Sequence, residues 1–97
     1  FFDQNGVLYF SDPWGSWLDN PIGGFYRYFP DGTLEQIDTE LAFPNGVALR
    51  ADGSAVFLAE TGHNRVLRYA VRAKALVLAR NERCVIRRRA DLMACVR

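Results

Sequence analysis

The stretch Asn5-Gly6-Val7-Leu8-Tyr9-Phe10-Ser11-Asp12 has the pattern of a tight turn followed by a short strand. Asn-Gly is a favoured turn dipeptide, and the apolar and aromatic run after it is typical of β-strands. The same order recurs in Asp52-Gly53 followed by Val56-Phe57-Leu58-Ala59-Glu60. One turn-and-strand unit therefore occurs twice in the chain.

The strand that follows each unit also recurs, as Tyr26-Arg27-Tyr28 and Leu67-Arg68-Tyr69. Leu8 and Val56 lie 48 positions apart, and Tyr26 and Leu67 lie 41 positions apart. This spacing matches the roughly 40 to 50 residues of a four-stranded propeller blade, with the longer loop at 14–21 taking up the difference. A single meandering antiparallel sheet is the alternative, because all hairpins look alike in sequence.

Short β-rich runs separated by turns extend over most of the chain and predict an all-β protein. Besides the strands already described, we expect an inner strand at 46–49 and an edge strand at 33–38, where apolar and polar residues alternate less cleanly. The favoured architecture is a partial six-bladed β-propeller of about two four-stranded antiparallel blades. The first blade covers about 1–40 and the second begins at about 41, within a propeller region at 1–69.

The segment 70–97 departs from this pattern. It contains no Gly or Pro, and its Ala, Leu, Val and Arg content fits neither the strand period nor the helix period. We interpret it as a divergent or frame-shifted basic tail, with a helix as the alternative. At the other end, Phe1-Phe2-Asp3 looks like the interior of a strand, so we expect the chain to be a piece of a longer protein.

Charge is distributed unevenly along the chain. Residues 1–69 hold nine acidic and four basic side chains, whereas residues 70–97 hold two acidic and eight basic ones. A basic tail can bind nucleic acid, but Arg87-Arg88-Arg89 has no interleaved aromatic residues and no recognisable binding fold around it. We therefore expect no nucleic-acid partner.

Two further features bear on the environment of the protein. No apolar run approaches the roughly 20 residues that a membrane helix needs, so we expect no membrane partner. The two cysteines, Cys84 and Cys95, are eleven positions apart and lack the spacing and the His partners of a zinc site. Thiols used so sparingly favour a reducing compartment, and we expect a cytoplasmic protein.

Asn45 is the first candidate site residue, in the stretch Leu41-Ala42-Phe43-Pro44-Asn45-Gly46-Val47-Ala48-Leu49. Pro44 fixes its own φ, and Gly46 lets the backbone approach its neighbours closely, so Asn45 is held at the mouth of an inner strand. Its amide oxygen is a hard neutral ligand suited to Ca²⁺. Asn-Gly is equally an ordinary turn dipeptide, and the chemistry of the residue leaves both interpretations open.

This stretch, followed by Ala51-Asp52-Gly53, Ala59-Glu60-Thr61 and Arg65-Val66-Leu67-Arg68-Tyr69, resembles the family of gluconolactonase, regucalcin (senescence marker protein) and diisopropyl fluorophosphatase. The earlier segments 8–15 and 20–24 are similar to bacterial members. The resemblance covers residues 1 to about 69. It implies a six-bladed propeller with a Ca²⁺ ion in the central channel, held by one Glu, two Asn and one Asp from different blades.

Within this resemblance, Asn45 corresponds to the ligand in the family's Pro-Asn-Gly motif. The family's Glu belongs to an earlier blade, its other Asn lies just upstream of Phe1, and its Asp lies in a blade after residue 70. We therefore expect a fragment of a calcium-dependent hydrolase of lactones or related esters that is inactive alone. The alternatives are a strictosidine-synthase-like propeller and a non-catalytic binding propeller.

Several residues near these motifs are candidates for the substrate pocket. Trp14 and Trp17 can form an apolar lip over a small lactone or ester, although packing between blades explains them equally well. Asp12 and Glu60 end equivalent strands, which argues against a shared acid and base role, and we expect Asp12 to cap the loop that begins at Pro13. His63 is expected to be a solvated turn residue.

Overall fold

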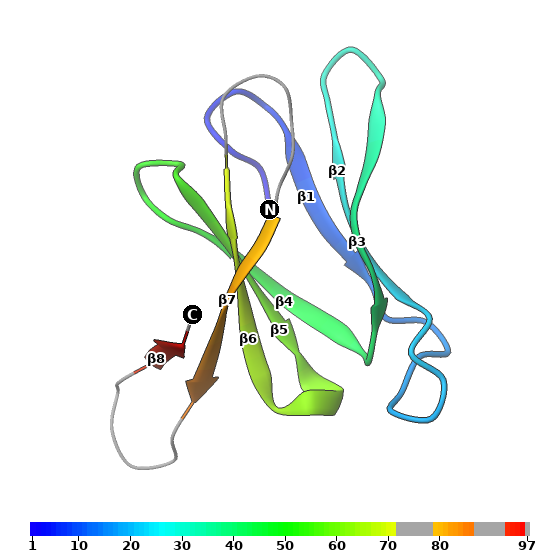
Figure 1. Cartoon of the computed structure of the whole chain (residues 1–97). Coiled ribbons are helices and arrows are strands. Elements are labelled where there is room, and N and C mark those ends of the chain that lie inside the picture. The colour runs from blue at the N-terminus through cyan, green and yellow to red at the C-terminus, as the bar shows by residue number, and fades with distance from the viewer. Residues whose placement is uncertain (72–78, 87–92, 97) are drawn as a thin grey trace.

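The computed structural model describes residues 1–71, 79–86 and 93–96, and in this part the chain consists of strands and turns (Figure 1). A single 3₁₀ turn, η1 (Thr61–His63), follows the fifth strand of the described residues. The all-β prediction is confirmed. The strands, in chain order, are β1 (Leu8–Asp12), β2 (Gly23–Tyr28), β3 (Leu34–Leu41), β4 (Pro44–Leu49), β5 (Ala55–Glu60), β6 (Arg65–Ala70), β7 (Ala79–Ile86) and β8 (Met93–Val96).

The strands form two antiparallel sheets, ordered β1-β2-β3 and β4-β5-β6-β7-β8. The first sheet ends at Leu41 and the second begins at Pro44, so the chain crosses between them in two residues. β3 is an edge strand, as predicted for 33–38, but it continues to Leu41. A bulge between β2 and β3 interrupts their register near Phe25, which lets β3 run on past the point where clean alternation ends.

The two sheets repeat the same local geometry where the sequence repeats. β1 pairs with β2 as β5 pairs with β6, and both pairs are antiparallel. The turns that precede β1 and β5 contain Gly6 and Gly53, whose φ angles are +78° and +74°. Because L-residues with a side chain rarely adopt this conformation, glycine serves the same purpose in both turns.

The described part of the predicted tail is extended. β7 pairs with β6, and β8 pairs with β7. The helical alternative for this segment is therefore wrong for residues 79–86 and 93–96, because the free edge of β6 offers backbone hydrogen-bonding groups that an added strand satisfies. The other positions of the tail, 72–78, 87–92 and 97, lie outside the described residues.

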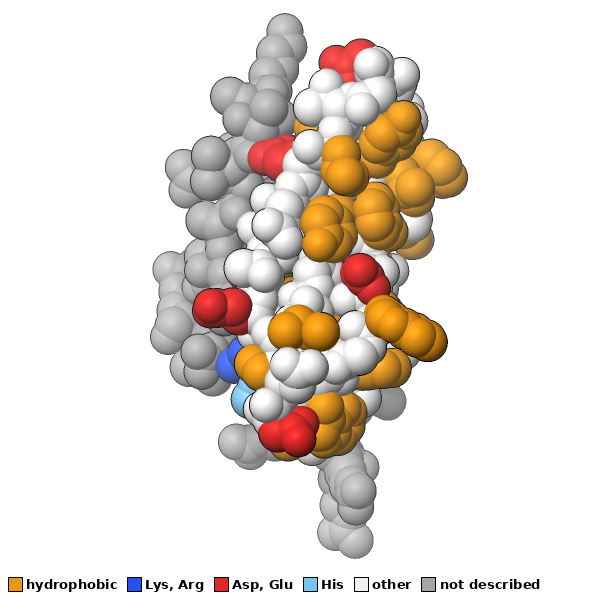
Figure 2. Space-filling view, turned by 90° about the vertical axis from the view of Figure 1, so that its right-hand side faces the viewer, with side chains coloured by type: hydrophobic (Ala, Val, Ile, Leu, Met, Phe, Trp, Pro, Cys, Tyr) orange, Lys and Arg blue, Asp and Glu red, His pale blue; other side chains and the backbone are white. Residues whose placement is uncertain are grey.

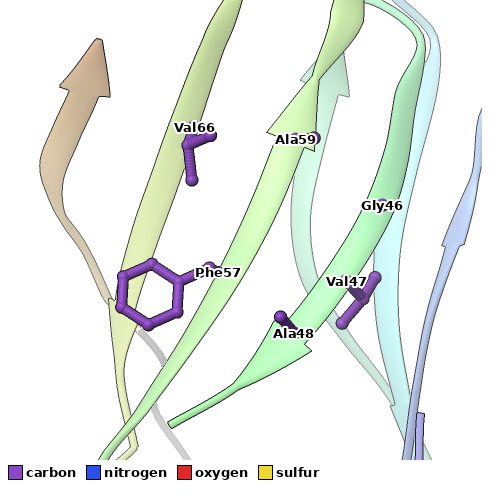
Figure 3. A pocket seen from close by; sticks show the side chains of 6 residues that line it. All are labelled: Gly46, Val47, Ala48, Phe57, Ala59 and Val66. Carbon is purple, nitrogen blue, oxygen red and sulfur yellow. The ribbon is translucent and has the colours of Figure 1, made fainter. Parts of the chain in front are cut away.

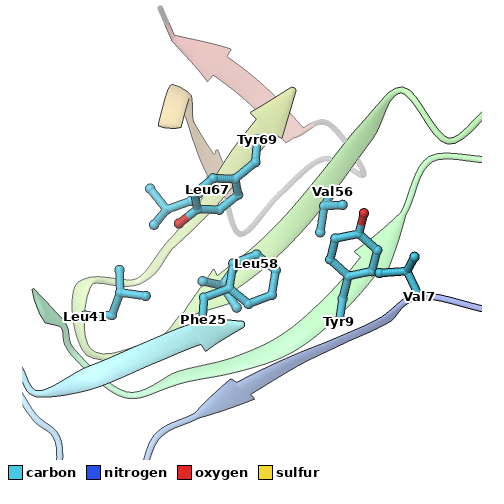
Figure 4. Close-up of a cluster of buried hydrophobic side chains, with 8 residues drawn as sticks. All are labelled: Val7, Tyr9, Phe25, Leu41, Val56, Leu58, Leu67 and Tyr69. Atoms are coloured by element: carbon cyan, nitrogen blue, oxygen red, sulfur yellow. The ribbon is translucent and has the colours of Figure 1, made fainter. Parts of the chain in front are cut away.

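The core lies between the two sheets, which pack face to face. The rings of Phe25 in the first sheet and Tyr69 in the second are 5.3 Å apart, and both side chains are almost fully buried. Alternate residues of a strand point to opposite faces, so each sheet contributes one face to this core. The buried cluster consists of Val7, Tyr9, Phe25, Leu41, Val56, Leu58, Leu67 and Tyr69 (Figure 4).

The opposite face of the first sheet is open and apolar. Phe10 stacks on Tyr26 with 5.3 Å between ring centroids, and these side chains lie on the face away from the core. Tyr28 and Leu34, which are register partners, are 45% and 57% exposed. Figure 2 shows hydrophobic side chains gathered on the side of the molecule where this sheet lies. Such a surface is typical of a sheet that packs on another element.

No helix long and apolar enough to cross a membrane is present in the part of the chain that the structure describes.

Candidate functional site

Three segments meet at one end of the two sheets (Figure 1). They are the loop at 13–22 between β1 and β2, the corner at 42–43 between β3 and β4, and η1 after β5. The backbone N–H of Phe43 donates to Oγ of Ser16 at 3.0 Å, and the N–H of Thr61 donates to the carbonyl of Phe43 at 3.0 Å. The corner is thus bound from both sides, and it leads directly into Asn45.

Asn45 is the second residue of β4, the edge strand of the second sheet, and it is exposed. The register between β4 and β5 shifts between Pro44 and Val47, so Asn45 and Gly46 form an irregular step in the strand. The hydroxyl of Ser11 in the first sheet donates to the Asn45 carbonyl at 2.7 Å. The backbone of Asn45 is therefore fixed against the first sheet, while its amide side chain is available to a ligand.

Asp12 ends β1 and is exposed. Its Oδ1 accepts a hydrogen bond from the backbone N–H of Trp14 at 3.2 Å, which confirms the predicted cap of the loop that begins at Pro13. Its register partner in β2 is Gly24, which has no side chain to offer. Asp12 therefore has a local structural role.

Trp14 and Trp17 lie on the same loop and differ in exposure. Trp14 is 88% exposed, whereas Trp17 is 48% exposed and its ring meets that of Phe43 edge-on at 6.2 Å. The structure thus brings Trp17 next to the corner that precedes Asn45. The role of both tryptophans as a lip over a substrate stays a prediction.

Glu60 ends β5 at the position equivalent to Asp12, yet it is fully buried. Its Oε2 accepts the backbone N–H of Ala42 at 2.9 Å, and its Oε1 accepts Nε of Arg65, its register partner in β6. A carboxylate held by a cation and a backbone donor is satisfied in place, which is the condition for burying a charge. Glu60 therefore lies away from solvent and supports the corner through its hydrogen bond with the N–H of Ala42.

His63 is the last residue of η1 and is 44% exposed, as expected for a turn. Its Nε2 lies 3.9 Å from Oε2 of Glu60. This neighbour could not be predicted from the sequence, because the proximity depends on how the 3₁₀ turn folds back over the end of β5.

Ser16 is a site residue that sequence reasoning missed. It is 5% exposed, and besides accepting the N–H of Phe43 its hydroxyl donates to the Pro13 carbonyl at 2.6 Å. A single serine in an irregular loop carries no periodic signal, so only the packing of that loop on the corner reveals its partner.

A shallow apolar pocket of ≈ 380 Å³ lies on the outer face of the second sheet (Figure 3). It begins at Gly46, directly after Asn45, and side chains from β4, β5 and β6 surround it. Its walls are almost entirely carbon, so it offers contact area without polar groups to orient a ligand. The lining residues are Gly46, Val47, Ala48, Phe57, Ala59 and Val66.

Among the residues that the structure describes, no group of three or more His, Cys, Asp or Glu side chains could hold a metal ion. Asn45 offers an exposed amide at this end of the sheets. Its neutral oxygen suits a hard cation such as Ca²⁺, which takes six to eight oxygen ligands. Asn45 fits such an ion as one ligand of a larger set.

Comparison with known proteins shows which family the chain resembles. The family model of the SMP-30/gluconolactonase/LRE-like region matches residues 1–93, and so reaches past the segment at 1–69 on which the resemblance rests. A protein named lactonase drp35 from Staphylococcus aureus is 38% identical over 71 residues, which are 72% of this chain and 22% of that protein. The protein of the same name from Staphylococcus epidermidis is 34% identical over 79 residues, which are 80% of this chain and 24% of that protein.

The chain thus spans less than a quarter of the curated relatives that it matches. The family match nevertheless covers almost all of its length and includes the corner, the Asn45 step and both copies of the repeated unit. The chain therefore belongs to the SMP-30/gluconolactonase/LRE-like family.

Proposed function

We propose that this chain forms two neighbouring blades of a larger β-propeller that hydrolyses lactones or related esters with the help of Ca²⁺. The observation that carries the proposal is the exposed Asn45 amide, held at a fixed corner in a chain whose matched relatives are named lactonases. Each further feature below supports one part of this proposal.

The two sheets support the propeller. They pack face to face through equivalent strands, and each leaves an apolar face on its outer side. A repeat unit that buries one face against a neighbour and exposes the other is typical of arrays in which further copies continue the stack. In a closed ring, further blades would cover both open faces.

Asn45 supports the metal dependence. Its backbone is fixed by Ser11 and its side chain is exposed, so the amide oxygen can enter a shared coordination sphere. When bound, Ca²⁺ supplies Lewis-acid polarisation of a substrate carbonyl. The described residues offer no cluster of acidic or imidazole ligands, so the remaining ligands would come from other blades. We accordingly propose that the 97-residue chain is inactive by itself.

The loop at 13–22 supports a small-molecule substrate. Trp17 lies beside the corner, Trp14 projects into solvent, and Asp12 fixes the start of the loop. Apolar rings around a single polar position are typical of small-molecule sites. A lactone or ester would contact Trp14 and Trp17, while Asp12 would shape the loop that carries them.

The test is a calcium titration of the full-length protein that carries this sequence, by calorimetry, together with lactone hydrolysis. Asn45→Ala should lower calcium affinity and hydrolysis together by about tenfold or more. Asn5→Ala, an exposed asparagine in the turn before β1, is the matched control and should change neither.

Other outcomes separate the alternatives. A full-length protein that binds no Ca²⁺ would contradict the hydrolase and favour a non-catalytic binding propeller. Calcium binding that depends on Asn45 without lactone or ester hydrolysis would favour a strictosidine-synthase-like propeller with different chemistry.

A further inference from the structure

The proposed function leaves the buried carboxylate of Glu60 without a role. Glu60 is fully buried at the end of β5, and Arg65, its register partner in β6, is the cation that balances it. Both oxygens of the carboxylate are engaged, one by Arg65 and one by the backbone N–H of Ala42. Ala42 lies in the corner that leads into Asn45, three residues further on.

This corner has a backbone conformation that needs support. Phe43 has φ of +51°, in the left-handed region that bulky residues rarely adopt, and Glu40 just before the corner has φ of +57°. Such conformations are costly and persist only where the surrounding structure fixes them. The contacts around the corner therefore determine where β4 begins and how it is oriented.

Three of these contacts come from one short segment at the end of β5. The carboxylate of Glu60 accepts the Ala42 N–H, the N–H of Thr61 donates to the Phe43 carbonyl, and the N–H of Gly62 donates to the Ala42 carbonyl at 2.9 Å. A charged acceptor makes a stronger hydrogen bond to a backbone N–H than a neutral one. The segment at 60–62 thus holds both residues of the corner.

Gly62 shows how close this approach is. A Cβ atom at Gly62 would lie 2.7 Å from both the Cβ and the carbonyl oxygen of Ala42. Real Cβ contacts do not occur at this distance, so a side chain here would force the corner to move. A substitution at Gly62 can therefore displace the corner while the charges of Glu60 and Arg65 stay unchanged.

The same segment sets the register at Asn45. Pro44 pairs with Glu60, and the register then shifts before the next pair, Val47 with Leu58. The irregular step contains Asn45 and Gly46, and an irregular step of this kind re-aims a side chain relative to a regular strand. The direction of the Asn45 amide therefore depends on the pairing that Glu60 anchors.

We propose that Glu60, charge-balanced by Arg65, is a positioning residue that fixes the corner at 42–43 and thereby aims the Asn45 amide at the metal. This inference rests on the proposed role of Asn45 as a ligand. Glu60 acts through Ala42 and does not touch the ion. We therefore expect a substitution of Glu60 to weaken metal binding by more than its effect on folding stability explains.

The experiment measures the calcium Kd of the full-length protein by calorimetry, well below the melting temperature of each variant. Glu60→Ala, which removes the acceptor for Ala42, and Gly62→Ala, which displaces the corner sterically, should each raise Kd by about tenfold or more, as loss of an outer-shell partner does. Leu67→Ala is the matched control, because Leu67 is fully buried in the same sheet but lies outside the corner. It should lower Tm and leave Kd within about twofold.

The outcomes distinguish the proposed ligand role of Asn45 from the proposed positioning role of Glu60. If Asn45→Ala leaves Kd unchanged, the proposed metal ligand is wrong whatever Glu60 does. If Asn45→Ala weakens binding while Glu60→Ala and Gly62→Ala behave like Leu67→Ala, the positioning role is overturned and Glu60 is purely structural. Where Glu60→Ala fails to fold, Glu60→Gln and Gly62→Ala carry the same comparison, and Glu60→Gln should raise Kd less than Gly62→Ala because it retains one acceptor oxygen.

Discussion

The hydroxyl of Tyr69 donates a hydrogen bond to Oδ2 of Asp38 at 2.6 Å, and so joins β6 of the second sheet to β3 of the first. The two residues are 31 positions apart in the chain. The ring of Tyr69 lies in the core while its hydroxyl reaches the carboxylate at the border of the core. This hydrogen bond therefore adds a polar contact to the apolar packing between the two sheets.

Tyr69→Phe should lower the free energy of unfolding by about 1 to 3 kcal/mol, because it removes a hydrogen bond to a charged acceptor and keeps the ring in place. Urea denaturation measures the change. Tyr28→Phe, at a 45% exposed tyrosine on the open face, is the control and should cost less than about 0.5 kcal/mol. Equal effects of the two variants would show that the contact between Tyr69 and Asp38 adds nothing to stability.

Ser16→Ala should destabilise the corner. It leaves the N–H of Phe43 without its acceptor in a poorly accessible place, which costs about 1 to 3 kcal/mol. Ser11→Ala also removes a hydroxyl bond to the β4 region, but at an exposed position, where water replaces the lost partner. Denaturation curves should therefore show a larger loss for Ser16→Ala, and the reverse order would contradict the assignment of Ser16 as the support of Phe43.

In the turn before β5, we expect a lowered carboxyl pKa that nuclear magnetic resonance can measure. Hydrogen bonds from the hydroxyl and the backbone N–H of Ser54 lower the pKa of Asp52, and the backbone N–H of Thr33 lowers the pKa of Asp31 in the turn before β3. A folded-state pKa below the unfolded value means that the contribution to stability is present above the unfolded pKa, near 4, and is lost as pH falls through the folded pKa.

Ser54→Ala should raise the pKa of Asp52 toward its ordinary range, because it removes the hydroxyl donor, which lowers this pKa most, and leaves the backbone bond and the charge of Arg50. Asp31 is the internal control, since its partner Thr33 is untouched, and its titration should not move. Carboxyl chemical shifts followed across acidic pH measure both groups in one sample. If the pKa of Asp52 is the same in Ser54→Ala as in the unsubstituted protein, the Ser54 hydroxyl does not lower it.

The open faces predict that the isolated 97-residue chain self-associates. Apolar sheet faces in water favour association, and both outer faces carry exposed or half-buried aromatic and aliphatic side chains. Leu34→Lys on the first sheet and Phe57→Lys on the second should each shift sedimentation toward smaller species at the same concentration. Trp14→Lys is the control, because Trp14 is 88% exposed on a loop outside both faces. A larger effect of Trp14→Lys would place the association at the loop.

The strands were largely predictable, because the signals that define them are local. Turn dipeptides and β-rich runs place β1, β4, β5 and β6 within a residue or two of where the structure has them, and β2 within three. β7 and β8 escaped prediction, since 70–97 has no Gly or Pro and no clean period, and its strands form by pairing, β7 with the edge of β6 and β8 with β7. Asn45 was also found from its local motif, and its role as a ligand stays a prediction.

Asp12 and Glu60 mark the limit of what the sequence determined. The repeated pattern predicted that each residue ends a copy of the same strand, and the structure confirms this. Only the tertiary structure decided that Asp12, opposite Gly24, is exposed, whereas Glu60, opposite Arg65 and beneath Ala42, is buried. Local pattern determines which residues form a strand, but the environment of each side chain is set by tertiary partners such as Ala42, which lies 18 positions from Glu60 in the chain.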